Sequence, residues 1–254
     1  MLMSSVIAHR GARQQAAENT LRAMTLAAEQ GARWVELDVM LTADGIPVVF
    51  HDRYLDQLTN GYGELASYRF EQLQRLRVHA PIGSDDQAQP IPTLAEALQR
   101  LHALGLGLNL EIKPSTRSLW RETLQASLAV IQQSAPLPLV LSSFRHKAIA
   151  EALQLAPGIP RALLWERLPH DWKQTALKLE VRAIHLAEFA LRRWQVAEIR
   201  ASGFEVYVYT VNSIKRGKQL KSWGVNGVFT DHPAAFLSQP EWTTRQVRAY
   251  GEPL

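Results

Sequence analysis

The segment Trp34-Val35-Glu36-Leu37-Asp38-Val39 alternates apolar side chains with two carboxylates. A period of two is typical of a β-strand, and it places Glu36 and Asp38 on the same face. Two adjacent carboxylates repel each other, so a strand that buries them needs a cation, a shared proton or a basic partner nearby. The segment therefore predicts a buried strand that delivers charged groups to a site.

Similar short apolar runs alternate with amphipathic stretches on both sides of this strand, which is the pattern of repeated βα units. The eight predicted strands are Val6–Ala8, Trp34–Val39, Gly107–Ile112, Leu139–Leu141, Arg161–Leu164, Ala183–His185, Glu205–Tyr209 and Gly227–Phe229. The predicted helices are Thr20–Gln30, Thr93–Leu104, Ser118–Gln133, His146–Leu155, Asp171–Leu179, Leu191–Arg200, Ser213–Trp223 and Pro233–Leu237. At 254 residues, this succession predicts an α/β fold: one (β/α)8 TIM barrel spanning residues 1–254.

One stretch interrupts the alternation after the second strand. Asp44-Gly45 is a strong hairpin signal between Leu41 and His51. Residues 53–92 then contain turn-rich sequence around a short helix near Tyr68–Leu76, which predicts a small insertion over one end of the barrel. The final stretch, Gln239–Leu254, lacks a clear apolar face, so a loosely held tail is expected.

The composition limits the classes of function. There is no cysteine, which excludes disulfides, Cys-based zinc sites and a thiol nucleophile. The start of the chain has neither a basic n-region nor a long apolar run, so a cytoplasmic protein without membrane insertion is expected. The net charge of +4 comes from scattered Lys and Arg residues, and we therefore expect no binding to nucleic acid. The oligomeric state stays open.

A third carboxylate is expected to join the pair on the second strand. In the segment Asn109–Pro114, Glu111 and Lys113 share one face of the next predicted barrel strand. The C-terminal ends of barrel strands carry the catalytic groups, so Glu36, Asp38 and Glu111 are candidate metal ligands. A cluster of carboxylate oxygens suits one divalent cation, Mg²⁺ or Ca²⁺, better than zinc.

Two histidines are expected at the same end of the barrel. His9 and Arg10 end the first strand, and His51 follows the hairpin. One histidine could activate a nucleophile while the other protonates a leaving oxygen. The remaining histidines are expected to be structural or solvated, with His185, at a strand end, a weaker candidate for the pocket wall; they are His79, His102, His146, His170, His185 and His232.

The ordered motifs resemble the glycerophosphodiester phosphodiesterases, most closely the cytosolic bacterial type. The matching stretches are His9-Arg10-Gly11-Ala12, Glu18-Asn19-Thr20, Glu36–Val39, His51-Asp52, Glu111–Pro114, Ser142-Ser143-Phe144, Tyr209–Asn212 and Thr230-Asp231. The resemblance covers residues 6–236 and is specific because separate motifs agree in order and spacing. It implies a barrel that binds its metal through Glu36, Asp38 and Glu111.

The resemblance also implies that His9 and His51 form the acid/base pair and that Arg10 and Lys113 contact phosphate. Small water-soluble glycerophosphodiesters would be the substrates. Tyr209 stands where relatives usually carry tryptophan, and it is expected to pack on the glycerol carbons. Ala17 replaces the usual proline before Glu-Asn-Thr, and Arg77–Ile82 occupies the place of a Gly-x-Trp-Phe stretch.

Two alternative functions stay open at this point. One is a barrel phosphodiesterase that acts on intact lipid, in the manner of a phospholipase D or a phosphoinositide phospholipase; the sequence lacks the export signal that such enzymes usually carry. The other is a non-catalytic phosphodiester-binding protein, because a fold does not dictate function.

Overall fold

The computed structural model describes residues 1–113 and 119–243. Eight parallel strands form a closed ring, because β1 pairs with both β2 and β9. The ring strands are β1 (Val6–His9), β2 (Trp34–Leu41), β4 (Gly107–Ile112), β5 (Leu139–Ser143), β6 (Arg161–Trp165), β7 (Ala183–Ala187), β8 (Glu205–Tyr209) and β9 (Gly227–Thr230). The predicted (β/α)8 TIM barrel is confirmed.

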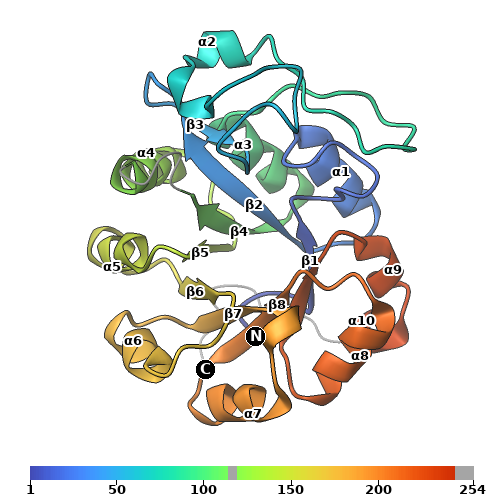
Figure 1. Ribbon diagram of the computed structural model, residues 1–254, viewed down its shortest axis with the longest axis vertical. Helices are drawn as coiled ribbons and strands as arrows, with labels where there is room; N and C mark the ends of the chain where they lie inside the picture. Colours follow the sequence, from blue (N-terminus) through green and yellow to red (C-terminus); the bar gives the residue numbers. More distant parts are fainter. Residues whose placement is uncertain (114–118, 244–254) are drawn as a thin grey trace.

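Helices surround the strands (Figure 1). They are α1 (Leu21–Glu29), α3 (Leu94–Leu104), α4 (Trp120–Gln133), α5 (His146–Leu155), α6 (Trp172–Lys178), α7 (Arg193–Ala201), α8 (Ile214–Ser222) and α9 (Pro233–Leu237). The start of α3 shows why the capping residues in the sequence predicted a helix start. Thr93 Oγ1 accepts a hydrogen bond from the Glu96 amide, and the Glu96 carboxylate accepts one from the Thr93 amide, which satisfies two amides that a helix start leaves open.

The strands are buried on both faces, as in other parallel sheets covered by helices. On β2, Val35 and Leu37 pack outward against the helices, whereas Trp34 lies in the apolar cluster inside the barrel. A Cβ on Gly107 would lie 2.5 Å from the Trp34 ring, so this position leaves no room for a side chain. Trp34 fills the lower part of the barrel, and the charged residues further along β2 reach the C-terminal end.

The hairpin and the insertion extend the C-terminal end of β2. β3 (Pro47–Val49) is antiparallel to β2, and the segment that follows contains two short helices, η1 (Leu65–Ser67) and α2 (Phe70–Leu73). Its apolar side chains join those of Met40 and Val48 in one cluster. Figure 1 shows the segment lying beside β3 at one side of the barrel.

The ends of some elements differ from the sequence expectation. Several strands continue one or two residues further at their C-terminal ends, for example β7 to Ala187, and the predicted helix starts at Thr20 and Thr93 are capping residues outside the helix. The predicted start of a helix at Ser118 lies outside the described residues.

The expectation of a loose tail is wrong for residues 239–243. Residues 240–243 form α10 (Pro240–Thr243), and Trp242 is buried against Phe236, with ring centroids 5.4 Å apart. Lys218 and Glu241 form an ion pair at 2.9 Å. One large aromatic side chain anchors this turn, which is too short to show any periodicity in sequence. The rest of the predicted tail lies outside the described residues.

Among the described residues, the helices are too short or too polar to span a bilayer.

Candidate active site

Three buried carboxylates meet at the C-terminal end of the barrel. The register between β2 and β4 sets Asp38 beside Glu111, while Glu36 lies beside His9 of β1. Each of Glu36, Asp38 and Glu111 is at most 7% exposed, and each offers an oxygen within 4.8 Å of the others. The structure therefore brings the three sequence-predicted metal ligands together.

The three carboxylates carry more negative charge than the neighbouring cations neutralise, as the directions of their pKa shifts indicate. Burial raises the pKa of Glu36 well above its usual range, and the charges of Asp38 and Glu111 raise it further. Burial also raises the pKa of Glu111, although Lys113 opposes this. For Asp38, burial is outweighed by the charges of Lys113 and Arg10, which hold its pKa below the ordinary value. Only part of the buried negative charge is neutralised by the protein.

Such a donor set could hold a divalent cation. It offers hard oxygen ligands in a compact arrangement, with neither histidine nor cysteine among the three residues. A cation would favour ionised carboxylates at all three positions and remove the mutual repulsion that the pKa of Glu36 records.

The two predicted basic residues are bound to this cluster. Lys113 Nζ lies 2.8 Å from Glu111 and 3.5 Å from Asp38. Arg10 Nε lies 3.2 Å from Asp38, and Arg10 Nη1 lies 2.7 Å from Glu18. Both cations border the space beside the carboxylates, so either could contact a phosphate there.

The turn after β1 aims Arg10 and its backbone at the carboxylates. Arg10 adopts a left-handed conformation, with φ 55°, and its amide donates to Glu36 Oε2 at 3.1 Å. Gly11 has φ 80°, and a Cβ there would lie 2.7 Å from Ala23, so only glycine fits this turn. Asn19 fixes the other side of the cluster, because its Nδ2 donates to Asp38 Oδ2 at 2.9 Å.

His9 is oriented by Asp231, a residue of the Thr230-Asp231 motif for which the sequence alone predicts no role. His9 Nδ1 donates to Asp231 Oδ1 at 2.7 Å, since an ionised carboxylate can only accept. This leaves Nε2, which lies 3.8 Å from Glu36 Oε2, on the side of the carboxylates. Burial lowers the pKa of His9, while the hydrogen bond to Asp231 opposes that shift. Asp231 itself is held by Asn212, whose Nδ2 donates to Oδ2 at 2.7 Å.

Burial would raise the pKa of Asp231, but the hydrogen bond from His9 and nearby charges lower it to about 2. The aspartate therefore stays ionised and keeps the His9 ring in one tautomer. Asp231 could not be paired with His9 from sequence, because β9, which precedes Asp231, pairs with β1 only when the barrel closes. Asn212 follows β8, the other neighbour of β9. The one available signal was their position at strand ends.

His51 has a similar partner next to it in the sequence. Its Nδ1 donates to Asp52 Oδ1 at 2.5 Å, which leaves Nε2 available to a ligand. Burial lowers the pKa of His51, and the charge of Asp38 opposes that shift. Both candidate acid/base histidines are thus oriented by an aspartate.

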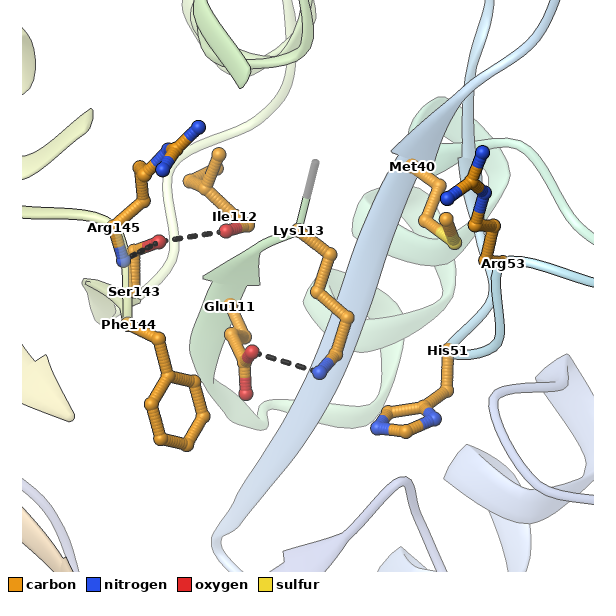
Figure 2. A pocket seen from close by; sticks show the side chains of 9 residues that line it. All are labelled: Met40, His51, Arg53, Glu111, Ile112, Lys113, Ser143, Phe144 and Arg145. Atoms are coloured by element: carbon orange, nitrogen blue, oxygen red, sulfur yellow. Dashed lines mark hydrogen bonds and ion pairs between the residues drawn. The ribbon is translucent and has the colours of Figure 1, made fainter. Parts of the chain in front are cut away.

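Two neighbouring cavities open beside these groups. The narrower one, about 160 Å³, is bounded by His9, Asn109, Leu164, Tyr209 and Phe229. The wider one, about 380 Å³, is drawn in Figure 2 with Arg53, Lys113 and Arg145 on its wall. His51, Glu111, Lys113 and Phe144 line both, so the cavities meet next to the carboxylate cluster.

Tyr209, the candidate aromatic wall, lines the narrower cavity. Its ring meets Phe144 edge to face, with centroids 5.9 Å apart. Its hydroxyl and Asn109 Oδ1 are buried, and neither has a hydrogen-bond partner among the described residues. Burial raises the pKa of Tyr209, and the charges of Glu111 and Glu166 raise it further. The hydroxyl therefore remains protonated.

His185, the weaker candidate, is fully buried in the barrel interior. Its ring packs against Phe229 and Tyr207, with centroids 5.0 and 5.5 Å away, and it lines neither cavity. This position indicates a structural role.

Comparison with known proteins agrees with the geometry. Residues 9–235 match the glycerophosphoryl diester phosphodiesterase family. A glycerophosphodiester phosphodiesterase of Caldanaerobacter subterraneus subsp. tengcongensis is 30% identical, over 92% of this chain and 96% of its own. YhdW of Bacillus subtilis is 33% identical, over 90% of this chain and 94% of its own.

A solved structure of an Oleispira antarctica phosphodiesterase, in complex with the product sn-glycerol-3-phosphate, superposes with a TM-score of 0.88. It is 37% identical in sequence, over 93% of this chain and 96% of that one. The family match and the full-length relatives confirm the resemblance found in the sequence. The chain belongs to the glycerophosphoryl diester phosphodiesterase family.

Proposed function

We propose that this chain hydrolyses water-soluble glycerophosphodiesters to sn-glycerol 3-phosphate and an alcohol, using one bound divalent cation and two histidines. The observation that carries the proposal is the convergence of three buried carboxylates within 4.8 Å beside two histidines, each oriented by an aspartate. Phosphodiester hydrolysis needs charge neutralisation at phosphate together with proton transfer on both sides of phosphorus, and this arrangement offers groups for both.

The cation would be Mg²⁺ or Ca²⁺, held by Glu36, Asp38 and Glu111. When bound, it supplies Lewis-acid stabilisation of the charge on the phosphate oxygens. The protein itself would stabilise the phosphate charge through Arg10 and Lys113, which both lie beside the carboxylates. On substrate binding, each would exchange part of its ion pairing for a phosphate oxygen.

The two histidines divide the proton transfers in this proposal. One accepts a proton from the nucleophile, which is either water or the neighbouring glycerol hydroxyl, and the other donates a proton to the leaving alcohol oxygen. If the glycerol hydroxyl attacks, water then opens the resulting cyclic phosphate to give glycerol 3-phosphate. Because Asp231 and Asp52 each bind an Nδ1 atom, the reactive atom is Nε2 in both cases. Asp231 and Asp52 are positioning residues that fix the ring tautomer.

Recognition would centre on the glycerol 3-phosphate half of the substrate. Tyr209 would pack on the glycerol carbons. Tyr209 and Asn109 both line the narrower cavity, and their buried hydroxyl and Oδ1, which have no partner among the described residues, would hydrogen-bond the glycerol hydroxyls. Substrates lacking these hydroxyls would leave buried polar groups unpaired. Several alcohols should be accepted on the other side, with glycerophosphocholine, glycerophosphoethanolamine and glycerophosphoglycerol cleaved within about a factor of 100, or roughly 2.7 kcal/mol.

Product analysis on these three substrates tests the proposal. A coupled glycerol 3-phosphate dehydrogenase assay should detect product from each, and a chelator should abolish the signal until Mg²⁺ or Ca²⁺ is restored. Release of phosphocholine from glycerophosphocholine would show that the opposite ester bond is cut. Full turnover by metal-stripped protein would contradict the role of the carboxylates.

A further inference from the structure

We infer that the wider cavity receives the leaving alcohol and favours alcohols that carry a negatively charged group, such as serine with its carboxylate. This inference rests on the proposed function and refines its substrate class. It follows from where the two cavities meet, from their sizes, and from the charges on their walls.

The two cavities match the two arms of a phosphodiester. They share His51, Glu111 and Lys113, which are the groups proposed to act on the phosphate. A phosphate placed beside these residues extends one ester arm into each cavity. His51 would then stand next to both arms, whereas His9 borders only the narrower cavity.

The size and polarity of each cavity indicate which ester arm of the substrate it receives. The narrower cavity, about 160 Å³, is built from barrel strand ends and is lined by Tyr209 and Asn109, whose buried hydroxyl and Oδ1 have no partner among the described residues. A rigid wall of this kind suits a small, constant, hydroxyl-bearing group such as glycerol. The wider cavity, about 380 Å³, has room for the arm that varies between substrates.

The wider cavity has an excess of positive charge on its wall. Arg53, Lys113 and Arg145 contribute cations, and Glu111 is the only carboxylate among the described residues that line it. In Figure 2, Arg53 and Arg145 lie on opposite sides of Lys113, above His51 and Phe144. They come from different parts of the chain, Arg53 from the start of the insertion and Arg145 from the residue before α5.

Ion pairs at Arg53 and Lys113 reduce this excess. Arg53 Nη2 pairs with Glu64 at 2.6 Å, yet half of the Arg53 side chain is exposed and its other donors can turn to a ligand. Glu111 is paired with Lys113 and is proposed to bind the cation as well. A trimethylammonium group in this cavity would meet like charges, whereas a carboxylate would meet opposite ones.

Glycerophosphoserine and glycerophosphoethanolamine form a matched pair of probes, because their leaving alcohols differ only by a carboxylate. At low ionic strength, we expect the ratio of kcat/KM for the serine substrate over the ethanolamine substrate to be about five to twenty, as two exposed charge pairs, one with Arg53 and one with Arg145, would give together. Raising the salt concentration to about 0.5 M should bring the ratio towards one, because screening weakens these pairs.

Variants identify the residues responsible. Arg53→Gln and Arg145→Gln should each lower the ratio at least about twofold, the double variant should bring it near one, and Arg145→Glu should push it below one. Arg75→Gln is the control, since Arg75 is an exposed arginine of the insertion that lines neither cavity, and it should keep the wild-type ratio.

A wild-type ratio at or below one would overturn the inference, and so would a double variant that keeps the wild-type ratio. Either result leaves the proposed function standing as long as both substrates yield glycerol 3-phosphate. If neither substrate yields glycerol 3-phosphate in the presence of Mg²⁺ or Ca²⁺, the proposed function itself fails.

Discussion

Replacing His185 by leucine is expected to make the protein less sensitive to acid unfolding. The His185 ring is fully buried against Tyr207 and Phe229, and its ring nitrogens have no hydrogen-bond partner among the described residues. Burial lowers the pKa of His185 from 6.5 to about 3. The ring therefore stays neutral in the folded protein at pH values well above 3.

The sign and size of the effect follow from proton linkage. Below pH 6.5 the unfolded chain binds a proton at His185, while the folded chain does not until about pH 3. The free energy of unfolding therefore falls as the pH drops through this window, by up to about 1.4 kcal/mol per pH unit. Between pH 7.5 and pH 5.0 the loss from His185 alone is about 2 kcal/mol.

Leucine has no such titration. Near neutral pH, His185→Leu loses aromatic edge contacts of about 0.5–1.5 kcal/mol, but it also removes unpaired buried polar atoms, so the net change should be small. At pH 5.0 the variant should gain about 2 kcal/mol relative to wild type. For a chain of this length that gain corresponds to a difference in Tm of about 4–8 °C.

Thermal or urea unfolding of both proteins at pH 7.5 and pH 5.0, in a chelator so that metal binding does not contribute, measures this difference. His79→Leu is the control, because it replaces an exposed histidine and should follow the wild-type pH dependence. If His185→Leu and wild type lose the same stability between the two pH values, the buried ring does not cause the acid sensitivity.

Three further predictions concern the active site. Glu111→Ala should weaken the binding of Mg²⁺ or Ca²⁺ in a calorimetric titration and also lower turnover, because it removes one of three ligands; unchanged metal affinity would argue against its role. His9→Ala and His51→Ala should each lower kcat on the order of 10²–10⁴-fold with folding intact by circular dichroism, and near-wild-type turnover in both would remove them as the acid/base pair. Asp231→Asn should lower kcat by a similar factor with little change in KM, since it disturbs the tautomer of His9 and leaves the phosphate contacts in place; a change confined to KM would contradict a positioning role.

The sequence was sufficient for the architecture and for the groups that sit on consecutive strands. The alternation of Glu36 and Asp38 along one strand places both side chains on one face through strand geometry alone, and the position of Glu111 on the next ring strand brings a third carboxylate to the same end of the barrel. Periodicity and capping residues such as Thr93 likewise marked the helices, because these signals depend on neighbours in the chain.

The closed barrel decided the contacts between residues that are distant in sequence. Asp231 reaches His9 only because β9 pairs with β1, and Arg53 faces Arg145 across a cavity that no local pattern describes. Trp242 is buried because the surface left by α9 accepts its ring. His185 could have faced the pocket or the core, and its height along β7 relative to Tyr207 and Phe229 placed it in the core. Local sequence fixes which face of an element a side chain occupies, whereas ring closure and packing fix its partners and its access to solvent.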